Sequence, residues 1–348
     1  MRVPFLPSIS LDRMGAAMRR RCRTPTRSGL SALLTALLLT SVACSDRPVG
    51  ETEDGGTAGS AGRASETALS TSTGTPVTMM GAGDVAGQDA AATARLIRDA
   101  EPDAVFTTGD NAYPDGSRSD YAELYEPTWG SFKDRTHPVP GNHDYHVDDA
   151  AGYIGYFGAD KVTNGADGGL YYAWDVGNGW RAYALNTEIS TTGAQLRWLR
   201  DDVAAHPDRH YILYAHRPRY TSGKPHEPSE DICPLWEELG ATGGLEIVLA
   251  GHNHQYERFT PMDCAGRVTP EGARSFVIGS GGNTLYEFGE IQRGSEFRDN
   301  SAFGVLKLVL HENFYEWEFI ASDRGQDGSE KVDTDNAGRI LDKGSSDV

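Results

Sequence analysis

The sequence lacks an apolar run of membrane length, and it is poor in basic side chains. It has 32 Lys and Arg against 50 Asp and Glu, which gives a formal net charge of −18 over 348 residues. No apolar stretch reaches the roughly 20 residues that cross a bilayer. The deficit of basic side chains argues against a protein that binds nucleic acid by neutralising its phosphates. There is also no internal repeat, which excludes repeat architectures.

Arginine is concentrated at the start of the chain, ahead of a short apolar run. Residues 1–43 hold seven Arg and one acidic residue, Asp12, and the apolar run 30–40 precedes small residues before Cys44. A basic segment, a short apolar segment and small residues before a cut are typical of a secretory signal. We therefore expect 1–43 to be a signal peptide, and the protein to be exported to the periplasm, the cell surface or the medium.

The residues after this leader predict an anchored tether. Cys44 resembles the lipidated Cys of bacterial lipoproteins, although Ser41 stands where such signals prefer Leu. Residues 44–75 are Gly, Ser, Thr, Ala and acids with almost no large apolar side chain, as in a disordered linker. We expect membrane contact only through a lipid on Cys44. Without its leader the chain carries −24, because the leader itself is basic.

Two of the four Cys remain for the folded part, since Cys22 lies in the leader and Cys44 at the cut. In an exported protein, Cys233 and Cys264 are expected to form a disulfide, the alternative being two separate buried thiols. Residues 323–348 are again acidic and rich in Gly and Ser, so we interpret them as a tail. This leaves 76–322 as one domain, and no feature indicates an oligomeric state.

Apolar runs alternate with helical patterns in this domain. The first half predicts strands at 77–80 and 104–108 and helices at 88–100 and 119–129, the latter with its aromatic residues and Leu124 on one face. The second half predicts a hairpin over 170–185, a helix at 193–205, strands at 211–214, 247–249 and 276–278, and a closing hairpin over 303–320. The pattern alone indicates an α/β fold with at least one mixed sheet and helices outside.

Five polar clusters follow predicted strands, where active-site loops of α/β sheets lie. They are Gly83-Asp84, Gly109-Asp110 with Tyr113, Gly141-Asn142-His143-Asp144, Ala215-His216, and Gly251-His252-Asn253-His254. Each cluster alone is more often a turn or a solvated loop than a ligand site. His252 and His254, two apart on an extended segment, point the same way. Together the clusters supply two carboxylates, a phenol, an amide oxygen and three imidazoles, which suit Fe, Mn or Zn and exceed the needs of one ion.

In this order, the five clusters resemble the motifs of the calcineurin-like metallophosphoesterases. Tyr113, three residues after Asp110, is similar to the purple acid phosphatase branch. One departure is Ala86, where the family has a Gly in a turn. The sequences Tyr113-Pro-Asp-Gly and Tyr256-Glu-Arg resemble small bacterial members rather than two-domain plant enzymes. The resemblance implies two stacked mixed β-sheets flanked by helices, in a single catalytic domain that is a metal-dependent phosphoric ester hydrolase.

The resemblance also implies a role for each motif residue. The first metal, Fe(III) in the family, would be held by Asp84, Tyr113 and His254. The second, a divalent ion (Fe, Zn or Mn), would be held by Asn142, His216 and His252, with Asp110 bridging both. His143 would face the substrate, and His226 fits the spacing of a second such residue. The other five His match no motif and are interpreted as surface or structural residues: His137, His146, His206, His210 and His311.

The implied reaction is hydrolysis of phosphomonoesters by in-line attack of a metal-bound hydroxide, with His143 and His226 assisting the leaving alkoxide. The acidity of the chain does not exclude it. Fe(III) and a divalent ion, less three anionic ligands and a hydroxide, leave a net charge of about +1 at the site, and distant surface acids are screened beyond roughly 8–10 Å. Two alternatives stay open: a phosphodiesterase or nucleotidase of the same fold, and a non-catalytic anchored binding protein.

Overall fold

The computed structural model describes residues 74–87, 89–163, 167–325 and 338–348, all of which belong to one compact unit. The expected signal peptide, Cys44 and nearly all of the tether lie outside the described residues. Within the described ranges, no helix has both the length and the apolar character needed to cross a membrane.

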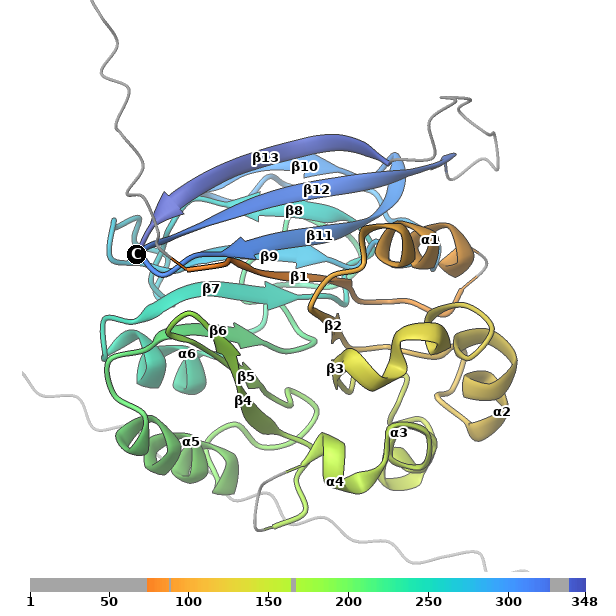
Figure 1. The fold of residues 1–348 in the computed structure, drawn as a ribbon, viewed down its shortest axis with the longest axis horizontal. Coiled ribbons are helices and arrows are strands. Elements are labelled where there is room, and N and C mark those ends of the chain that lie inside the picture. Colours follow the sequence, from red (N-terminus) through yellow and green to blue (C-terminus); the bar gives the residue numbers. More distant parts are fainter. Residues whose placement is uncertain (1–73, 88, 164–166, 326–337) are drawn as a thin grey trace, which may run out of the picture. The chain divides into compact units, whose positions relative to one another are not determined.

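The first sheet combines parallel strands from the start of the chain with antiparallel strands from its end (Figure 1). Strands β1 (Val77–Ala82), β2 (Ala104–Thr108) and β3 (Thr136–Val139) run parallel. Strands β11 (Ala302–Leu310), β12 (Phe314–Gly325) and β13 (Arg339–Asp347) follow on the other side of β1 as an antiparallel meander. The order β13-β12-β11-β1-β2-β3 makes this a mixed sheet, and the predicted closing hairpin is its β11–β12 pair.

The second sheet is also mixed, in the order β10-β8-β9-β7-β6-β5-β4. Strands β5 (Trp180–Ala184), β6 (His210–Tyr214), β7 (Leu245–Ala250) and β9 (Arg274–Ile278) run parallel. The antiparallel strands are β4 (Tyr172–Gly177), β8 (Tyr256–Phe259) and β10 (Ser295–Asp299). The predicted hairpin over 170–185 is the β4–β5 pair.

The two sheets pack face to face around the main hydrophobic core. Alternation along β1 sends Met79 into this core and Met80 to the opposite face. Phe106 and Leu308 of the first sheet meet Trp180 of the second in the same core, all fully buried. Burial of each such side chain contributes about 1.5–3 kcal/mol. This packing fixes the two sheets against each other and therefore fixes the relative position of their strand ends.

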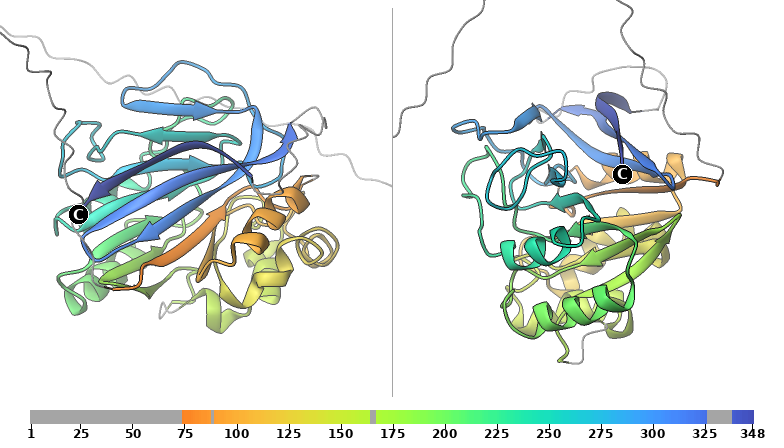
Figure 2. Two further views of the ribbon diagram at one scale, coloured as in Figure 1. Left: turned by 45° about the horizontal axis from the view of Figure 1, so that its top comes forward. Right: turned by 90° about the vertical axis from the view of Figure 1, so that its left-hand side faces the viewer.

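Helices cover both outer faces (Figures 1 and 2). On the first sheet lie α1 (Ala90–Ala100), α2 (Arg118–Asp120), η1 (Tyr121–Tyr125), η2 (Trp129–Arg135), η3 (Asp148–Ala150), α3 (Ala151–Phe157) and α4 (Ala159–Val162). On the second lie α5 (Ala194–Ala205) and α6 (Cys233–Gly240). The expected architecture, two stacked mixed sheets flanked by helices, is confirmed.

The helix expected over 119–129 is irregular, and the position predicted for Leu124 is wrong. A capping box of Ser117 and Asp120 starts the segment, which continues as a π-helical turn and then as 3₁₀ turns. Tyr121 and Tyr125 take the inward face, while Leu124 is 40% exposed. The widened turn rotates Leu124 away from the core, which a regular 3.6-residue period does not anticipate.

The expected domain boundary at residue 322 is also wrong. Strand β12 continues to Gly325, and residues 339–347 form β13, which pairs with β12 from Phe314↔Asp347 to Ala321↔Arg339. Asp342 of β13 is buried and accepts hydrogen bonds from Tyr256 Oη (2.8 Å) and from Arg258 Nε (2.7 Å). An edge strand has one solvated face, so its sequence is polar enough to resemble a tail.

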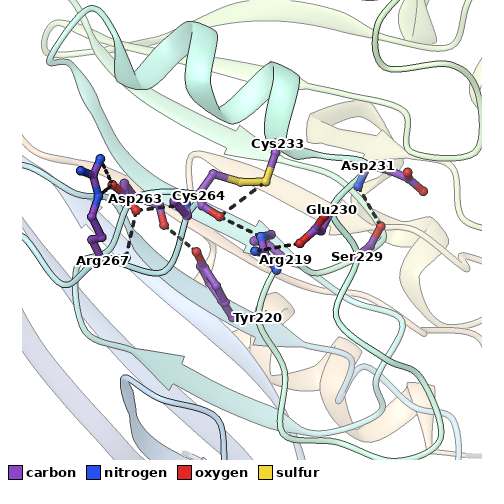
Figure 3. Close-up of a disulfide and its surroundings, with 10 residues drawn as sticks. Arg219, Tyr220, Ser229, Glu230, Asp231, Cys233, Asp263, Cys264 and Arg267 are labelled. Atoms are coloured by element: carbon purple, nitrogen blue, oxygen red, sulfur yellow. Dashed lines mark hydrogen bonds and ion pairs between the residues drawn. A yellow bond between two sulfur atoms is a disulfide. The ribbon is translucent and has the colours of Figure 1, made fainter. Parts of the chain in front are cut away.

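The expected disulfide between Cys233 and Cys264 is present (Figure 3). It joins the start of α6 to the segment that connects β8 and β9. Beside it, Arg219 Nε donates to the carbonyl of Cys264 at 2.9 Å, and Tyr220 Oη donates to the carbonyl of Asp263 at 2.5 Å. The loop before α6 is therefore attached to the β8–β9 segment by a covalent bond and by two hydrogen bonds.

Candidate metal centre

The carboxyl ends of parallel strands from both sheets converge at one place. Asp84, Asp110, His216 and His252 each follow the last residue of a strand by two positions: β1, β2, β6 and β7 respectively. Two hydrogen bonds join the sheets here, from His216 Nδ1 to the Thr108 carbonyl (2.9 Å) and from the His252 N–H to Asp84 Oδ2 (2.9 Å). Ligand sites of α/β sheets form at such strand ends.

The backbone at these strand ends is tightly turned. Asp84, Asp110 and His252 have positive φ values of 58°, 49° and 69°, a conformation that costs a side-chain-bearing residue about 1–3 kcal/mol. Gly141 packs so closely that a Cβ at this position would run into Asp110 Oδ1. The surrounding sheets hold three candidate ligands in unfavourable conformations, and such strain concentrates at functional sites.

Four side chains form the first cluster: Asp84, Asp110, Tyr113 and His254. Tyr113 Oη lies 2.9 Å from Asp84 Oδ1, 3.2 Å from Asp110 Oδ2 and 3.2 Å from His254 Nε2. His254 Nε2 is itself 3.2 Å from Asp84 Oδ1. Three oxygens and one nitrogen thus face a common centre, from elements far apart in the sequence.

Four side chains form the second cluster: Asp110, Asn142, His216 and His252. His216 Nε2 lies 3.1 Å from Asn142 Oδ1, 3.4 Å from Asp110 Oδ2 and 3.1 Å from His252 Nδ1. Ligand atoms of Asp110, His216 and His252 lie within 4.8 Å of one another, as a bound metal ion requires. Asp110 Oδ2 borders both clusters, which is the position of a bridging ligand.

The hydrogen bonds around the clusters leave lone pairs pointing inward. His216 donates its Nδ1 proton to the Thr108 carbonyl, and His254 donates its own to the Thr284 carbonyl at 2.7 Å. The Nε2 atom of each neutral ring is then unprotonated and faces its cluster, which is how metal-ligating His residues are oriented. Carboxylate and imidazole lone pairs this close repel one another unless a cation lies between them. The residues therefore fit two metal ions.

The pKa shifts of the cluster residues also indicate that the clusters favour cations. Burial, together with Asp84 and Asp110, raises the pKa of Tyr113 well above its ordinary value, so a phenolate here requires a cation. Burial lowers the pKa of His216, but the adjacent Asp110 carboxylate more than reverses this and raises it to about 10. Burial conversely raises the pKa of Asp110, while His216 and His143 bring it well below its ordinary value. Positive charge inside the clusters is strongly favoured.

The two predicted substrate-facing His lie beside the clusters. The His143 N–H donates to Asp110 Oδ1 at 2.8 Å and its Nδ1 to the Pro114 carbonyl at 2.5 Å, while its Nε2 lies 3.9 Å from Asp110 Oδ2. The His143 side chain is 30% exposed. The ring of His226 stacks on His252 with 3.8 Å between centroids, and burial lowers its pKa. The structure thus brings together all nine residues singled out from the sequence.

Residues of the segment between β7 and β8, and of β8 itself, hold the loop that carries His226. Asn253 Nδ2 donates to Thr221 Oγ1 at 3.0 Å and to the His226 carbonyl at 2.9 Å. The carboxylate of Glu257, fully buried, accepts from the N–H (2.7 Å) and the hydroxyl (2.5 Å) of Ser222. His252 and His254 therefore face the clusters, whereas Asn253 and Glu257 bond this loop.

Sequence reasoning missed several residues at the site. Arg217 Nη1 lies 3.3 Å from His252 Nε2, and Tyr286 stacks on His254 at 4.0 Å. Buried Asp144 accepts from the Gly141 N–H at 2.9 Å and so fixes the loop before Asn142. Asp144 belongs to the third polar cluster, although the sequence suggested no role for it. Arg217 adjoins the motif residue His216, a signal that could have been used, whereas nothing in the sequence marks Tyr286.

The remaining five His are interpreted from the sequence as surface or structural residues. In the described ranges none of them joins either cluster: His137, His146, His206, His210 and His311. His137 stacks on Trp174 with 3.7 Å between centroids. His146 lies nearer the site, with its ring 4.5 Å from that of His143 and its Nδ1 3.2 Å from Asp115 Oδ1.

Two stacked mixed sheets whose strand ends present a shared carboxylate between two ligand clusters define the binuclear metallophosphoesterase class. The chain belongs to the calcineurin-like phosphoesterase family, whose sequence profile matches residues 78–256. That match contains both clusters and ends two residues after His254.

Among known proteins, the chain is similar to purple acid phosphatases. It is 28% identical over 264 residues to purple acid phosphatase 21 of Arabidopsis thaliana, covering 68% of this chain and 58% of that protein. It is 27% identical over 184 residues to purple acid phosphatase 18 of the same plant, covering 47% and 41%. It is 28% identical over 218 residues to human acid phosphatase type 7, covering 52% and 47%. The chain thus spans about half the length of the curated relatives it matches.

Solved structures share the fold at lower identity. Purple acid phosphatase PPD1 from yellow lupin (Lupinus luteus) has a TM-score of 0.57 and 21% identity, covering 78% of this chain and 53% of that one. GAP50, described as the anchor in the inner membrane complex of Plasmodium, has a TM-score of 0.58 and 14% identity, covering 74% and 88%. At these identities the likeness concerns the fold alone.

Proposed function

We propose that this chain is an exported binuclear-metal phosphatase that hydrolyses phosphomonoesters. The observation that carries the proposal is the carboxylate oxygen Asp110 Oδ2, which lies 3.2 Å from Tyr113 Oη in the first cluster and 3.4 Å from His216 Nε2 in the second. A carboxylate in this position can bridge two cations. The partly exposed His143 lies beside this carboxylate, with its Nε2 3.9 Å from Asp110 Oδ2.

The donor sets suggest which ion goes where. The first cluster offers two carboxylates, a phenol and one imidazole, a hard set that suits Fe(III), whereas the second offers one carboxylate, an amide and two imidazoles, which suit a divalent Fe, Zn or Mn. When bound, such a pair of ions supplies an activated water nucleophile and neutralises charge on the phosphoryl group. The chain provides the ligands, and it provides the hydrogen bonds from the other ring nitrogens of His216 and His254 that orient them.

His143 is the residue we assign to the leaving group. Its Nδ1 is engaged with the Pro114 carbonyl, so Nε2 is the atom that can donate to an oxygen in the site. As an imidazolium, it would hydrogen-bond the leaving oxygen and transfer the Nε2 proton as the ester bond breaks. His226, stacked on His252, would assist from the side of the second cluster.

Export and anchoring belong to the same proposal. They rest on the sequence pattern of 1–43 as a signal, 44–75 as a tether and Cys44 as the lipidated residue. The Cys233–Cys264 disulfide supports an oxidising compartment. The partner is then a phosphate ester outside the cytoplasm, reached by a domain that touches the membrane only through its lipid.

Turnover of p-nitrophenyl phosphate and of its bis ester, with metal analysis on the same sample, tests the function. We expect two metal ions per chain and a preference for the monoester. A preference for the bis ester would instead indicate a phosphodiesterase or nucleotidase. Metal without turnover of either ester would indicate a non-catalytic role, such as the anchoring role described for GAP50.

The iron assignment has a separate test. Oxidised protein should show a visible charge-transfer band from Tyr113 to Fe(III), and Tyr113→Phe should abolish it. A colourless, iron-free and active protein would overturn the iron assignment and leave the two-metal proposal standing.

A further inference from the structure

We infer that Arg217 binds the third terminal oxygen of a phosphomonoester and thereby sets the preference for monoesters over diesters. The inference rests on the proposed function and names a residue that determines its substrate class. Neither the sequence motifs nor the family resemblance pointed to this residue. It is carried by the position of Arg217, by the way its guanidinium is held, and by the N–H groups that remain open.

Arg217 lies at the edge of the second cluster. It directly follows His216, and its Nη1 is 3.3 Å from His252 Nε2. Its side chain is 32% exposed, so it borders the cluster while remaining within reach of a ligand from solvent. Among the described Lys and Arg side chains, no other has a recorded hydrogen bond or ion pair with a residue of either cluster.

Glu188 fixes the orientation of the guanidinium. Arg217 Nε donates to Glu188 Oε1 at 2.8 Å and Nη2 donates to Oε2 at 2.7 Å, a bidentate pair. The Glu188 side chain is only 9% exposed, and its N–H donates to Asn186 Oδ1 at 2.9 Å. Two parallel bonds hold a guanidinium in one plane. Arg217 is therefore preorganised and loses little freedom when a ligand binds.

The count of donors leaves N–H groups for a ligand. A guanidinium has five N–H bonds, and Glu188 takes two of them. Nδ1 of His252 points into the second cluster, 3.1 Å from His216 Nε2. If Nδ1 is the ligating atom, Nε2 carries the ring proton and cannot accept from Arg217. The N–H groups on Nη1 then have no acceptor on His252, and they face the edge of the cluster.

The chemistry of the two ester classes makes this arginine selective. A monoester dianion has three terminal oxygens, whereas a diester has two and a single negative charge. Two terminal oxygens can face the two clusters, so only the monoester has a third one for a charged donor. Charge-assisted donors aimed at such an oxygen stabilise both the bound anion and the transition state. A diester would place an uncharged ester group there instead.

Three substitutions test the inference. Arg217→Met removes the charge and keeps the stem, Arg217→Lys restores a charge, and Arg200→Met is the matched control because Arg200 pairs with Glu238 on the surface. For Arg217→Met we expect kcat/KM on p-nitrophenyl phosphate to fall roughly 100-fold, the usual effect of losing one such donor. Turnover of the bis ester should change less than about threefold, and Arg217→Lys should recover part of the loss.

Binding gives a second readout. Titration of the metal-loaded protein with inorganic phosphate should show affinity weakened about tenfold in Arg217→Met and unchanged in Arg200→Met, at equal metal content. An equal loss on both esters, or unchanged phosphate affinity, would overturn the inference and leave the phosphatase proposal intact. A wild-type protein that turns over neither ester defeats the proposed function instead. If Arg217→Met also loses metal, Glu188→Gln gives the decisive measurement. A lower ratio of monoester to diester turnover in Glu188→Gln, at unchanged metal content, occurs only if Glu188 positions Arg217 for the phosphate.

Discussion

The two walls of the site are built by different means. The ligand wall consists of residues that follow strand ends by two to five positions, as Asp84, Asp110 and Asn142 follow β1, β2 and β3. The opposite wall is the substrate loop, residues 217–232, which has no regular structure before α6 and is held by side chains such as Asn253 and Glu257 and by the disulfide. The order and direction of the strands position the ligand wall, whereas individual side-chain contacts position the substrate loop. Changes in the two walls should therefore have different signatures.

The largest effect is expected in the ligand wall. Asp110→Asn removes the shared carboxylate, so both metal ions should be lost and kcat/KM should fall at least about 1000-fold. Elemental analysis and p-nitrophenyl phosphate turnover measure the two effects. Asp115→Asn, the same exchange at an exposed carboxylate, serves as control. Retained turnover in Asp110→Asn would refute the bridging role.

Next in size are the two His proposed to face the substrate, one on each wall. His143→Gln should lower kcat roughly 100-fold, because it removes the proposed proton donor, and the loss should be larger for alkyl than for p-nitrophenyl esters. His226→Gln should lower kcat only about tenfold, since the substrate loop holds its ring at the site. Metal content should stay unchanged in both. Equal effects of the two variants would contradict the division into two walls.

A smaller effect is expected where the substrate loop is anchored. In Glu257→Gln an amide N–H₂ would face the N–H and hydroxyl of Ser222. The free energy of unfolding should fall by about 1–3 kcal/mol, and KM should rise about tenfold as His226 shifts. Urea unfolding, steady-state kinetics and metal analysis give the readouts, with the exposed Glu312→Gln as control. Loss of metal together with the rise in KM would show that the walls are not independent.

The smallest effect on turnover should come from β13. Asp342→Asn weakens a buried contact to Tyr256 and Arg258, and we expect a loss of about 2 kcal/mol in the free energy of unfolding with kcat/KM nearly unchanged. Urea unfolding measures the loss in the free energy of unfolding, and Asp347→Asn on the exposed side of the same strand is the control. Identical unfolding midpoints for the two variants would contradict the assigned role of Asp342.

The sequence predicted most of the fold and the ligand wall, because both follow local patterns. Alternating apolar runs marked β1, β2, β6 and β7, and the polar residues after them proved to be neighbours in space. The rest depends on pairs that no local pattern reveals. Asp342 meets Tyr256 across 86 residues, Arg217 meets Glu188 across 29, and Glu257 meets Ser222 across 35. Each partner looks like an ordinary polar residue until the sheets bring it into place.

The pairing of β1 with β11 has a consequence for how this protein is made. All candidate ligands lie between Asp84 and His254, yet β1 is hydrogen-bonded to β11 from Val77↔Leu310 to Gly81↔Leu306. During synthesis, the strand that positions Asp84 must therefore wait for a partner that leaves the ribosome long after the last ligand motif. Such distant pairings fold slowly. A prematurely terminated product could carry every motif and still have no site, and β1, paired only with β2, would expose one free edge prone to aggregation.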